Sequence, residues 1–213
     1  MKKAEKLLKK LMPLYSWGWL TAALLTNLAV YGGCRLIAGG RTHYSLKLAL
    51  DDMIPMRSWF VIFYVLAYAQ WAVGFILIGR SDRQTSRFLF LSEIIAKLIC
   101  GLFFIFLPTT IARPQPGGGN FFDWLTAFIY KVDAADNLFP SIHCLESWVC
   151  FRSIRWLGKV PLWYKVFTLV FSLLVFASTV FLKQHVLVDI AGGILVFEVG
   201  MLICRKVTGY RKK

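Results

Sequence analysis

Two short stretches in the second half of the chain carry residue types suited to phosphoryl transfer. His185 and Asp189 are four residues apart at the start of an apolar run of helical length, a spacing that places both side chains on one face of a helix. A carboxylate in that place selects one tautomer of the imidazole and raises its basicity. His143 begins another apolar run and supplies the acid partner that a nucleophilic histidine requires. This combination predicts transfer of a phosphoryl group through a phosphohistidine.

The composition predicts where these residues lie. The 213 residues are 58% hydrophobic and their mean hydropathy is +0.61, which is too apolar for a soluble domain. Six apolar runs are long enough to cross a hydrocarbon core of about 30 Å, and they cover residues 14–37, 59–78, 88–107, 141–157, 166–182 and 185–204. Without a repeat or a linker, the sequence predicts one all-α domain over residues 1–213, a polytopic six-transmembrane-helix bundle. Residues 1–13 are expected to form an amphipathic helix on the cytoplasmic surface.

The basic residues predict the orientation. One set of span ends holds Lys2, Lys3, Lys6, Lys9, Lys10, Arg80, Arg83, Arg87, Arg152, Arg155, Lys159, Lys165, Arg205, Lys206, Arg211, Lys212 and Lys213, and the other set holds only Arg35, Arg41, Lys47, Arg57, Arg113, Lys131 and Lys183. The positive-inside rule therefore places both termini in the cytoplasm, with the protein in the cell membrane. The net charge of +14 also attracts anionic lipids. Because this charge is divided among short tails and loops, it argues against a nucleic-acid partner.

The same orientation gathers the candidate site residues on one side of the membrane. Arg113 follows the third span, Ser141 and His143 precede or begin the fourth, and Lys183 and His185 lie at the turn between the fifth and sixth. All of these span ends face outwards in the predicted topology. The sequence therefore predicts a site on the extracytoplasmic face.

Three motifs within residues 107–193 follow one another in a fixed order. They are Arg113-Pro114, then Pro140-Ser141-Ile142-His143, then Ser178-Thr179 followed at the proper spacing by His185 and Asp189. They resemble the motifs of the type 2 phosphatidic acid phosphatase superfamily of membrane lipid-phosphate phosphatases, which shares its core with vanadium haloperoxidases. In that family the motifs are a lysine seven residues before Arg-Pro, Pro-Ser-Gly-His, and Ser-Arg, five residues, His, three residues, Asp.

The chain departs from the family pattern at three positions. Phe106 stands at the first lysine, Ile142 at the glycine and Thr179 at the arginine of the third motif. Two phosphate-binding cations are therefore missing, and Lys183 is expected to replace one of them. A third motif without its arginine is similar to the sphingomyelin and inositol-phosphoceramide synthase branch, where transfer of a head group to an alcohol replaces hydrolysis.

The residues and the resemblance together imply a membrane lipid-phosphate phosphatase acting on a lipid phosphomonoester or diphosphate. His185 is the expected nucleophile, Asp189 holds its imidazole, and His143 protonates the leaving oxygen. The expected phosphate ligands are Arg113, Ser141, the amide of Ile142, Lys183 and the hydroxyl of Thr179. No cofactor is expected, and no metal, because the sequence has no acidic cluster to hold magnesium.

Several alternatives stay open. A lipid head-group phosphotransferase uses the same chemistry, and a non-catalytic transporter or lipid-binding protein would use Asn27, Gln70, Glu93 and Lys97 along one inward path. Among single residues, Ser141 is also a plausible helix cap, Arg113 an interfacial anchor and Lys183 a snorkelling lysine. In the outer loop, aromatic residues recur at helical spacing between 121 and 129, which predicts either an interfacial helix or a lid packed on the bundle.

Overall fold

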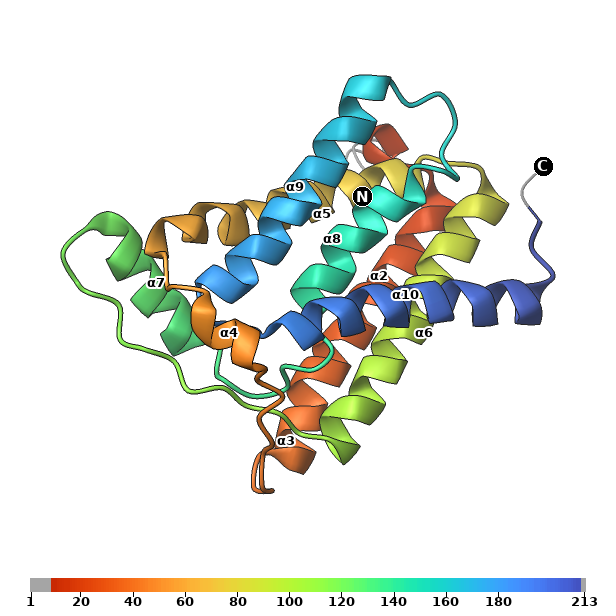
Figure 1. The fold of residues 1–213 in the computed structure, drawn as a ribbon. Coiled ribbons are helices and arrows are strands. Elements are labelled where there is room, and N and C mark those ends of the chain that lie inside the picture. The colour runs from red at the N-terminus through yellow and green to blue at the C-terminus, as the bar shows by residue number, and fades with distance from the viewer. Residues whose placement is uncertain (1–8, 212–213) are drawn as a thin grey trace.

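The computed structural model describes residues 9–211, which form a bundle of helices (Figure 1). In chain order the elements are α2 (Leu14–Leu28), the π-helical turn η1 (Ala29–Gly33), α3 (Cys34–Ala38), α4 (Ala49–Met53), the 3-10 turn η2 (Ser58–Phe60), α5 (Val61–Gly79), α6 (Arg83–Phe106), α7 (Phe121–Val132), α8 (Ile142–Ser153), α9 (Leu162–Phe181) and α10 (Leu187–Thr208). Within residues 9–211 the only β-type pairing is an isolated bridge between Tyr44 and Thr109, so the all-α class is confirmed there. The predicted surface helix at 1–13 lies largely outside the described residues.

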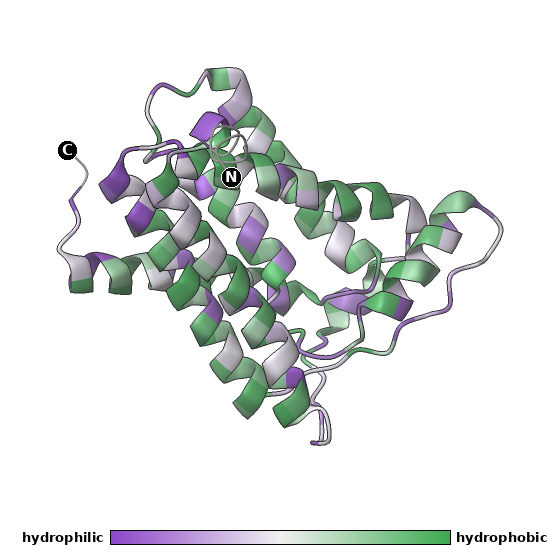
Figure 2. Cartoon of the chain, turned by 180° about the vertical axis from the view of Figure 1, so that it is seen from behind, coloured by the Kyte–Doolittle hydropathy of each residue, from purple (hydrophilic) through white to green (hydrophobic). Residues whose placement is uncertain are grey.

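Five helical segments have the length and composition of membrane spans. They are Leu14–Ala38, Ser58–Gly79, Arg83–Phe106, Leu162–Phe181 and Leu187–Thr208, and they overlap five of the six predicted spans. Figure 2 shows these long helices as largely hydrophobic. The remaining predicted span, 141–157, contains α8, whose 12 residues are fewer than the roughly 20 that a helix needs to cross a bilayer. The sixth crossing therefore stays a prediction.

Both ends of the described chain lie at the same end of the bundle. The Ser16 hydroxyl, early in α2, donates to the carbonyl of Gly79 at the end of α5 (2.7 Å). The hydroxyl of Tyr210, just after α10, is hydrogen-bonded to Thr85 in the first turn of α6 (2.7 Å). The start of α2, the α5–α6 turn and the end of α10 are thus together, and we call this the terminal end.

The chain on either side of α8 connects the terminal end with the opposite end of the bundle. The amide of Ser141 donates to the carbonyl of Asp189 in the first turn of α10 (3.1 Å). Three residues after α8, the Trp156 ring packs against Phe88 and Tyr210, with centroid separations of 5.1 and 5.7 Å. The segment from 141 to 156 therefore extends from the first turn of α10 to beyond its last turn.

Polar side chains inside the bundle form ion pairs and hydrogen bonds at separate places. The ammonium of Lys97 on α6 contacts carboxylate oxygens of Glu93 (2.6 Å) and of Glu146 on α8 (2.7 Å), and all three side chains are buried. The Gln70 amide on α5 donates to the Ser172 hydroxyl on α9 (3.2 Å). The Lys97 ammonium also donates to the carbonyl of Ala23 (3.4 Å), one turn of α2 before Asn27, which lies on the wall of a cavity that is described below. The residues considered for a transport path therefore form two separate sets of bonds, Glu93 with Lys97 and Gln70 with α9.

Loops at the end opposite the termini are tied to one another by backbone bonds. In the segment after α6, the carbonyl of Pro108 accepts from the amide of Tyr44 and the amide of Thr110 donates to the carbonyl of Tyr44, both at 2.9 Å. The hydroxyl of Thr109 accepts from the amides of Leu138 and Phe139 (3.1 and 2.8 Å), which precede α8. These bonds fix the two segments that carry the first two motifs relative to each other.

Helix α7 has two different faces. Phe122, Leu125 and Ile129 pack against a small buried cluster formed with α5 and the end of α9. On the opposite face, the rings of Phe121, Trp124 and Phe128 stack along the helix and are exposed. One face of α7 is thus packed on the bundle, and the other presents an aromatic row of the kind that lies in a lipid head-group layer.

Candidate active site

A cavity of about 250 Å³ opens at the end of the bundle opposite the termini. Its walls come from α2 (Asn27), η1 (Tyr31), α5 (Tyr68, Trp71), the segment after α6 (Arg113), the end of α7 (Val132), the segment after it (Asp133, Asp136, Asn137, Leu138), α8 (Ile142, His143) and the α9–α10 turn (Gln184, His185). At least one residue of each of the three sequence motifs therefore lines the same cavity. We call it the histidine cavity.

The pairing of His185 with Asp189 is present, but its local structure differs from the predicted one. The helix begins at Leu187, so His185 lies in the turn before it and only Asp189 is helical. A single carboxylate oxygen of Asp189 accepts from Nδ1 of His185 (3.0 Å) and from the amide of Val186 (3.1 Å). The carboxylate is thus both the N-terminal cap of α10 and the partner of the imidazole. Because Nδ1 is bonded to Asp189, Nε2 is the ring nitrogen of His185 that is available to a ligand.

The α9–α10 turn is held in place from two sides. The amides of Gln184 and His185 both donate to the carbonyl of Thr179 (2.9 and 3.1 Å). Lys183 adopts a left-handed backbone conformation with φ of +51°, and its ammonium donates to the carbonyls of Asp51 and Ile54 (2.9 and 2.5 Å) at α4. Burial lowers the pKa of the Lys183 ammonium. Lys183 therefore anchors the turn to α4 and is not brought to the histidine cavity.

Two other predicted phosphate ligands also lie off the cavity wall. The Ser141 hydroxyl is fully buried and accepts from the amide of Cys144 (3.3 Å), so it caps α8 as the alternative interpretation expected. Thr179 is fully buried too, and its hydroxyl donates to the carbonyl of Phe176 (2.8 Å). Ile142, by contrast, lines the cavity at the first position of α8, where a backbone amide has no acceptor within its own helix.

Aromatic rings from α5 hold His143. Tyr64, Tyr68 and Trp71 are spaced at four and three residues and so lie on one helix face. The imidazole stacks on Tyr64 (centroids 4.1 Å apart, 20° between planes), meets Tyr68 edge-on at 5.7 Å and lies 5.1 Å from Trp71. These contacts fix the position and the orientation of the imidazole.

Arg113 is the fixed cation of the site. Its guanidinium donates to the carbonyls of Asp133 and Ala134 and to Oε1 of Gln184, and it lies 5.0 Å from the Tyr130 ring centroid. Because a guanidinium only donates, Oε1 of Gln184 is the atom that faces it. The amide nitrogen of Gln184, a residue that is almost fully buried, is thus the atom without a partner.

Several buried polar atoms on the wall have no hydrogen-bond partner. They are Nε of Arg113, Nε2 of Gln184, Nε2 of His143, Oδ1 of Asn27 and Oδ1 of Asp136. A buried polar atom left unpaired costs about 1–3 kcal/mol. These five atoms are therefore available to water or to a polar ligand in the cavity.

Asp133 is the site residue that the sequence reasoning missed. Its two carboxylate oxygens accept from the hydroxyls of Tyr31 in η1 and Tyr64 on α5. Burial raises the pKa of Asp133, but the facing His143, the two hydroxyls and His185 outweigh that effect and hold the pKa below its usual value. These partners are distant in sequence, so no local spacing pointed to them. The only signal was a polar residue immediately after an amphipathic stretch.

No family model, curated protein or solved structure matches the chain. Within residues 9–211 no group of three or more His, Cys, Asp or Glu side chains is arranged to hold a metal ion.

Proposed function

We propose that the chain is a membrane lipid-phosphate phosphatase that acts through a phosphohistidine at His185. The observation that carries this proposal is the meeting of His185, held by Asp189, with His143 and Arg113 on one cavity wall. A nucleophile with an orienting carboxylate, a separate acid and a fixed cation are the parts that phosphoryl transfer requires. Resemblance to the type 2 phosphatidic acid phosphatase motifs supports the same chemistry.

The proposed reaction has two steps. Nε2 of His185 attacks phosphorus while the bond to the lipid oxygen breaks, and the proton on Nε2 of His143 passes to that oxygen. In the second step His143 takes a proton from water as the water oxygen bonds to phosphorus, and the phosphorus–nitrogen bond breaks. Inorganic phosphate and free His185 result. Arg113, the Gln184 amide and the first amide of α8 would stabilise charge on the phosphate oxygens in both steps.

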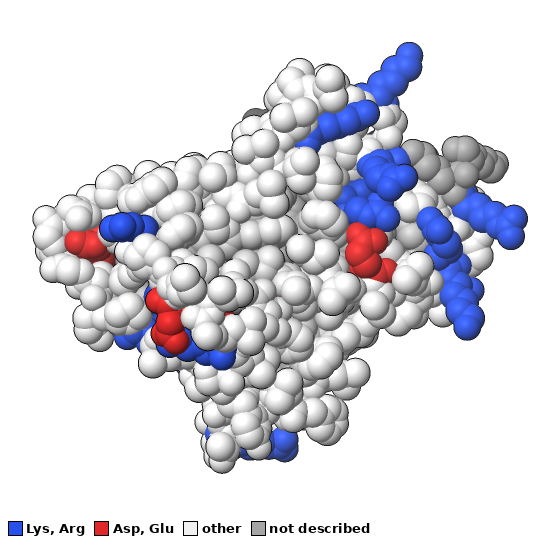
Figure 3. Space-filling view, in the orientation of Figure 1, with Lys and Arg blue, Asp and Glu red and all other residues white. Residues whose placement is uncertain are grey.

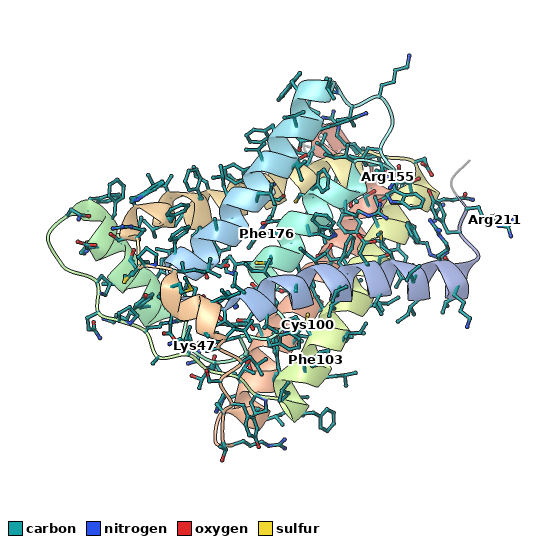
Figure 4. All side chains as sticks on the ribbon, in the orientation of Figure 1. Lys47, Cys100, Phe103, Arg155, Phe176 and Arg211 are labelled. Atoms are coloured by element: carbon teal, nitrogen blue, oxygen red, sulfur yellow. The ribbon has the colours of Figure 1, made fainter. Side chains whose placement is uncertain are left out.

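We further propose that the chain crosses the membrane six times, with its termini in the cytoplasm and the site on the outer face. The 141–156 segment supports a sixth crossing, since it joins the first turn of α10 to the terminal end. Charge supports the orientation, because Lys and Arg on the face drawn in Figure 3 gather mainly near the C-terminus. Figure 4 likewise shows Arg155 and Arg211 at the terminal end and Lys47 near α4 at the other.

A second candidate, a lipid head-group phosphotransferase, is favoured by the charge of the cavity. Lys183 bonds to α4 and Thr179 replaces an arginine, so Arg113 is the one permanently charged cation on a described wall that also carries Asp133 and Asp136. A site with few cations suits a phosphodiester, which carries one negative charge, better than a monoester, which carries two. The unpartnered acceptors on Asn27 and Asp136 also suit hydroxyl donors of a head group or an acceptor alcohol.

Phosphate release from a panel of lipids tests both candidates. Purified protein is given phosphatidic acid, phosphatidylglycerol phosphate, a polyprenyl diphosphate, a sphingolipid phosphate and the phosphodiester phosphatidylcholine, each with and without an alcohol acceptor. We expect phosphate release from a monoester or diphosphate without an acceptor, and loss of that release in His185→Ala. Turnover of the diester that requires the alcohol would favour the transferase. Full activity of His185→Ala would refute the phosphohistidine mechanism.

A further inference from the structure

His143 has a hydrogen-bonding partner that no sequence motif includes. Its Nδ1 lies 3.4 Å from the hydroxyl oxygen of Tyr64, and that hydroxyl donates to a carboxylate oxygen of Asp133 (2.8 Å). Because the Tyr64 hydroxyl donates its hydrogen bond to Asp133, the Tyr64 oxygen is free to accept a hydrogen bond from Nδ1 of His143. The 3.4 Å separation is long for a hydrogen bond, as is common in catalytic sites without substrate.

We propose that Asp133 and Tyr64 form a relay that positions His143 as the general acid. This inference rests on the proposed function. It mirrors the pairing of His185 with Asp189, with one hydroxyl inserted between carboxylate and imidazole. With Nδ1 protonated and bonded to Tyr64, the second proton of the imidazolium lies on Nε2, the buried atom on the cavity wall that has no partner. Asp133 and Tyr64 are positioning residues, since the reacting proton belongs to His143.

The surroundings of the relay hold the Asp133 carboxylate in place beside the imidazole. Tyr31 donates to the second oxygen of Asp133 from η1, so both oxygens are held and the carboxylate cannot rotate away. Arg113 donates to the backbone carbonyl of the same residue, which fixes the start of the segment before α8. The stack of His143 on Tyr64 keeps the imidazole next to the hydroxyl that it must reach.

The relay positions His143 in both steps, but the two kinds of ester differ only in the first step, where the leaving oxygen needs an acid. As the bond between phosphorus and the leaving oxygen breaks, both bonding electrons stay on that oxygen, and it takes the proton from Nε2 of His143. A leaving alkoxide needs this proton, whereas a nitrophenolate is stable without it. Loss of the relay should therefore slow the first turnover of alkyl esters and spare the first turnover of nitrophenyl esters, and a merely structural defect should slow both.

The test compares two phosphate monoesters with chains of equal length, one alkyl and one nitrophenyl, in mixed micelles. Tyr64→Phe keeps the ring stack and removes the hydroxyl, and Asp133→Asn keeps the shape and removes the charge. Tyr210→Phe is the matched control, because it deletes one tyrosine hydroxyl with a 2.7 Å bond at the terminal end of the bundle. We expect kcat for the alkyl ester to fall by roughly 10- to 100-fold in both relay variants, part of the 10²–10⁴-fold that a positioned acid supplies.

The remaining outcomes are equally definite. For the nitrophenyl ester the first-turnover release of nitrophenolate in both variants should stay within about threefold of wild type, and the double variant should lose no more than either single one, as expected for groups in one chain of bonds. Equal losses on both esters, or no loss on the alkyl ester, would overturn the relay while His185→Ala remains inactive. If wild type turns over neither ester, or His185→Ala stays active, the proposed function itself fails.

Discussion

Adding one methyl group at position 193 should move α8, which carries His143, relative to α10, which follows His185. Gly193 on α10 faces the first turn of α8, where an added Cβ would lie 2.6 Å from the carbonyl oxygen of Ser141 and 3.1 Å from the amide of Leu145. Ordinary contact begins at 3.4 Å, so the closest pair falls short by about 0.8 Å. Both atoms belong to the backbone and cannot rotate aside. Gly193→Ala therefore has to move α8 relative to α10.

The consequences for stability and for catalysis differ in size. Alanine gains about 1 kcal/mol over glycine inside a helix, and overpacking costs about 1–3 kcal/mol. The net loss of at most about 2 kcal/mol is below the 5–15 kcal/mol of a typical folded protein. His143 is on α8 and His185 directly precedes α10, so the shift changes the distance between them. A misplacement near 1 Å can cost on the order of 100-fold in rate.

Phosphate release and thermal unfolding in detergent measure the two effects separately. Gly200→Ala is the matched control, because its Cβ would lie 2.6 Å from the carbonyl oxygen of Ser92 on α6 and so creates an equal clash seven residues further along α10. We expect Gly193→Ala to lose roughly 100-fold in kcat and Gly200→Ala to lose far less, at similar unfolding temperatures. Equal losses in the two variants would refute the reasoning that the α8–α10 approach sets the catalytic geometry.

Three further predictions concern the α9–α10 turn and its ligand. Asp189→Asn should lower kcat by roughly 10²–10⁴-fold with little change in KM, because the His185 tautomer is no longer held; an unchanged kcat would contradict the pairing. Vanadate should inhibit competitively in the presence of a strong chelator, since its adduct with a histidine nitrogen resembles the transition state; a requirement for added magnesium would contradict this. Lys183→Ala should lower the unfolding temperature and reduce turnover of monoesters and diesters by similar factors, because its ammonium holds α4; a loss confined to monoesters would place that charge at the phosphate.

The spans could be predicted from the sequence because hydropathy over a bilayer's thickness is a strong and local signal. The segment 141–157 is the exception. It contains Glu146, Arg152 and Arg155 within an apolar run, and its helix ends at Ser153. Glu146 is buried because it contacts Lys97 on α6, and a partner at that sequence distance is invisible to a local hydropathy window.

The same division between local and distant interactions applies to the site. His143 and His185 could be placed because a capping serine and a four-residue spacing are local patterns. The expectation that Lys183 binds the phosphate came from its closeness to His185 in sequence and stays a prediction, whereas its carbonyl partners at α4, about 130 residues away in the chain, could not be foreseen. Asp133 was missed for the same reason, since the tyrosines that bond its carboxylate lie on η1 and α5.

The electrostatic balance of the cavity makes the lipid panel informative about charge as well as chemistry. Arg113 supplies one full positive charge, and the first turn of α8, which contains no acidic residue, adds about half a charge from the helix dipole. The first turn of α10 adds little, because Asp189 lies in it. Against this, Asp133 is ionised, while Asp136 is paired with Arg35 at 3.0 Å.

A phosphate with two negative charges thus meets little net positive charge before either histidine is protonated. Protonation of His143 would add the cation that makes binding of a doubly charged monoester favourable. On this basis, weaker monoester binding at high pH should accompany the loss of the acid, whereas binding of a singly charged diester should depend less on pH.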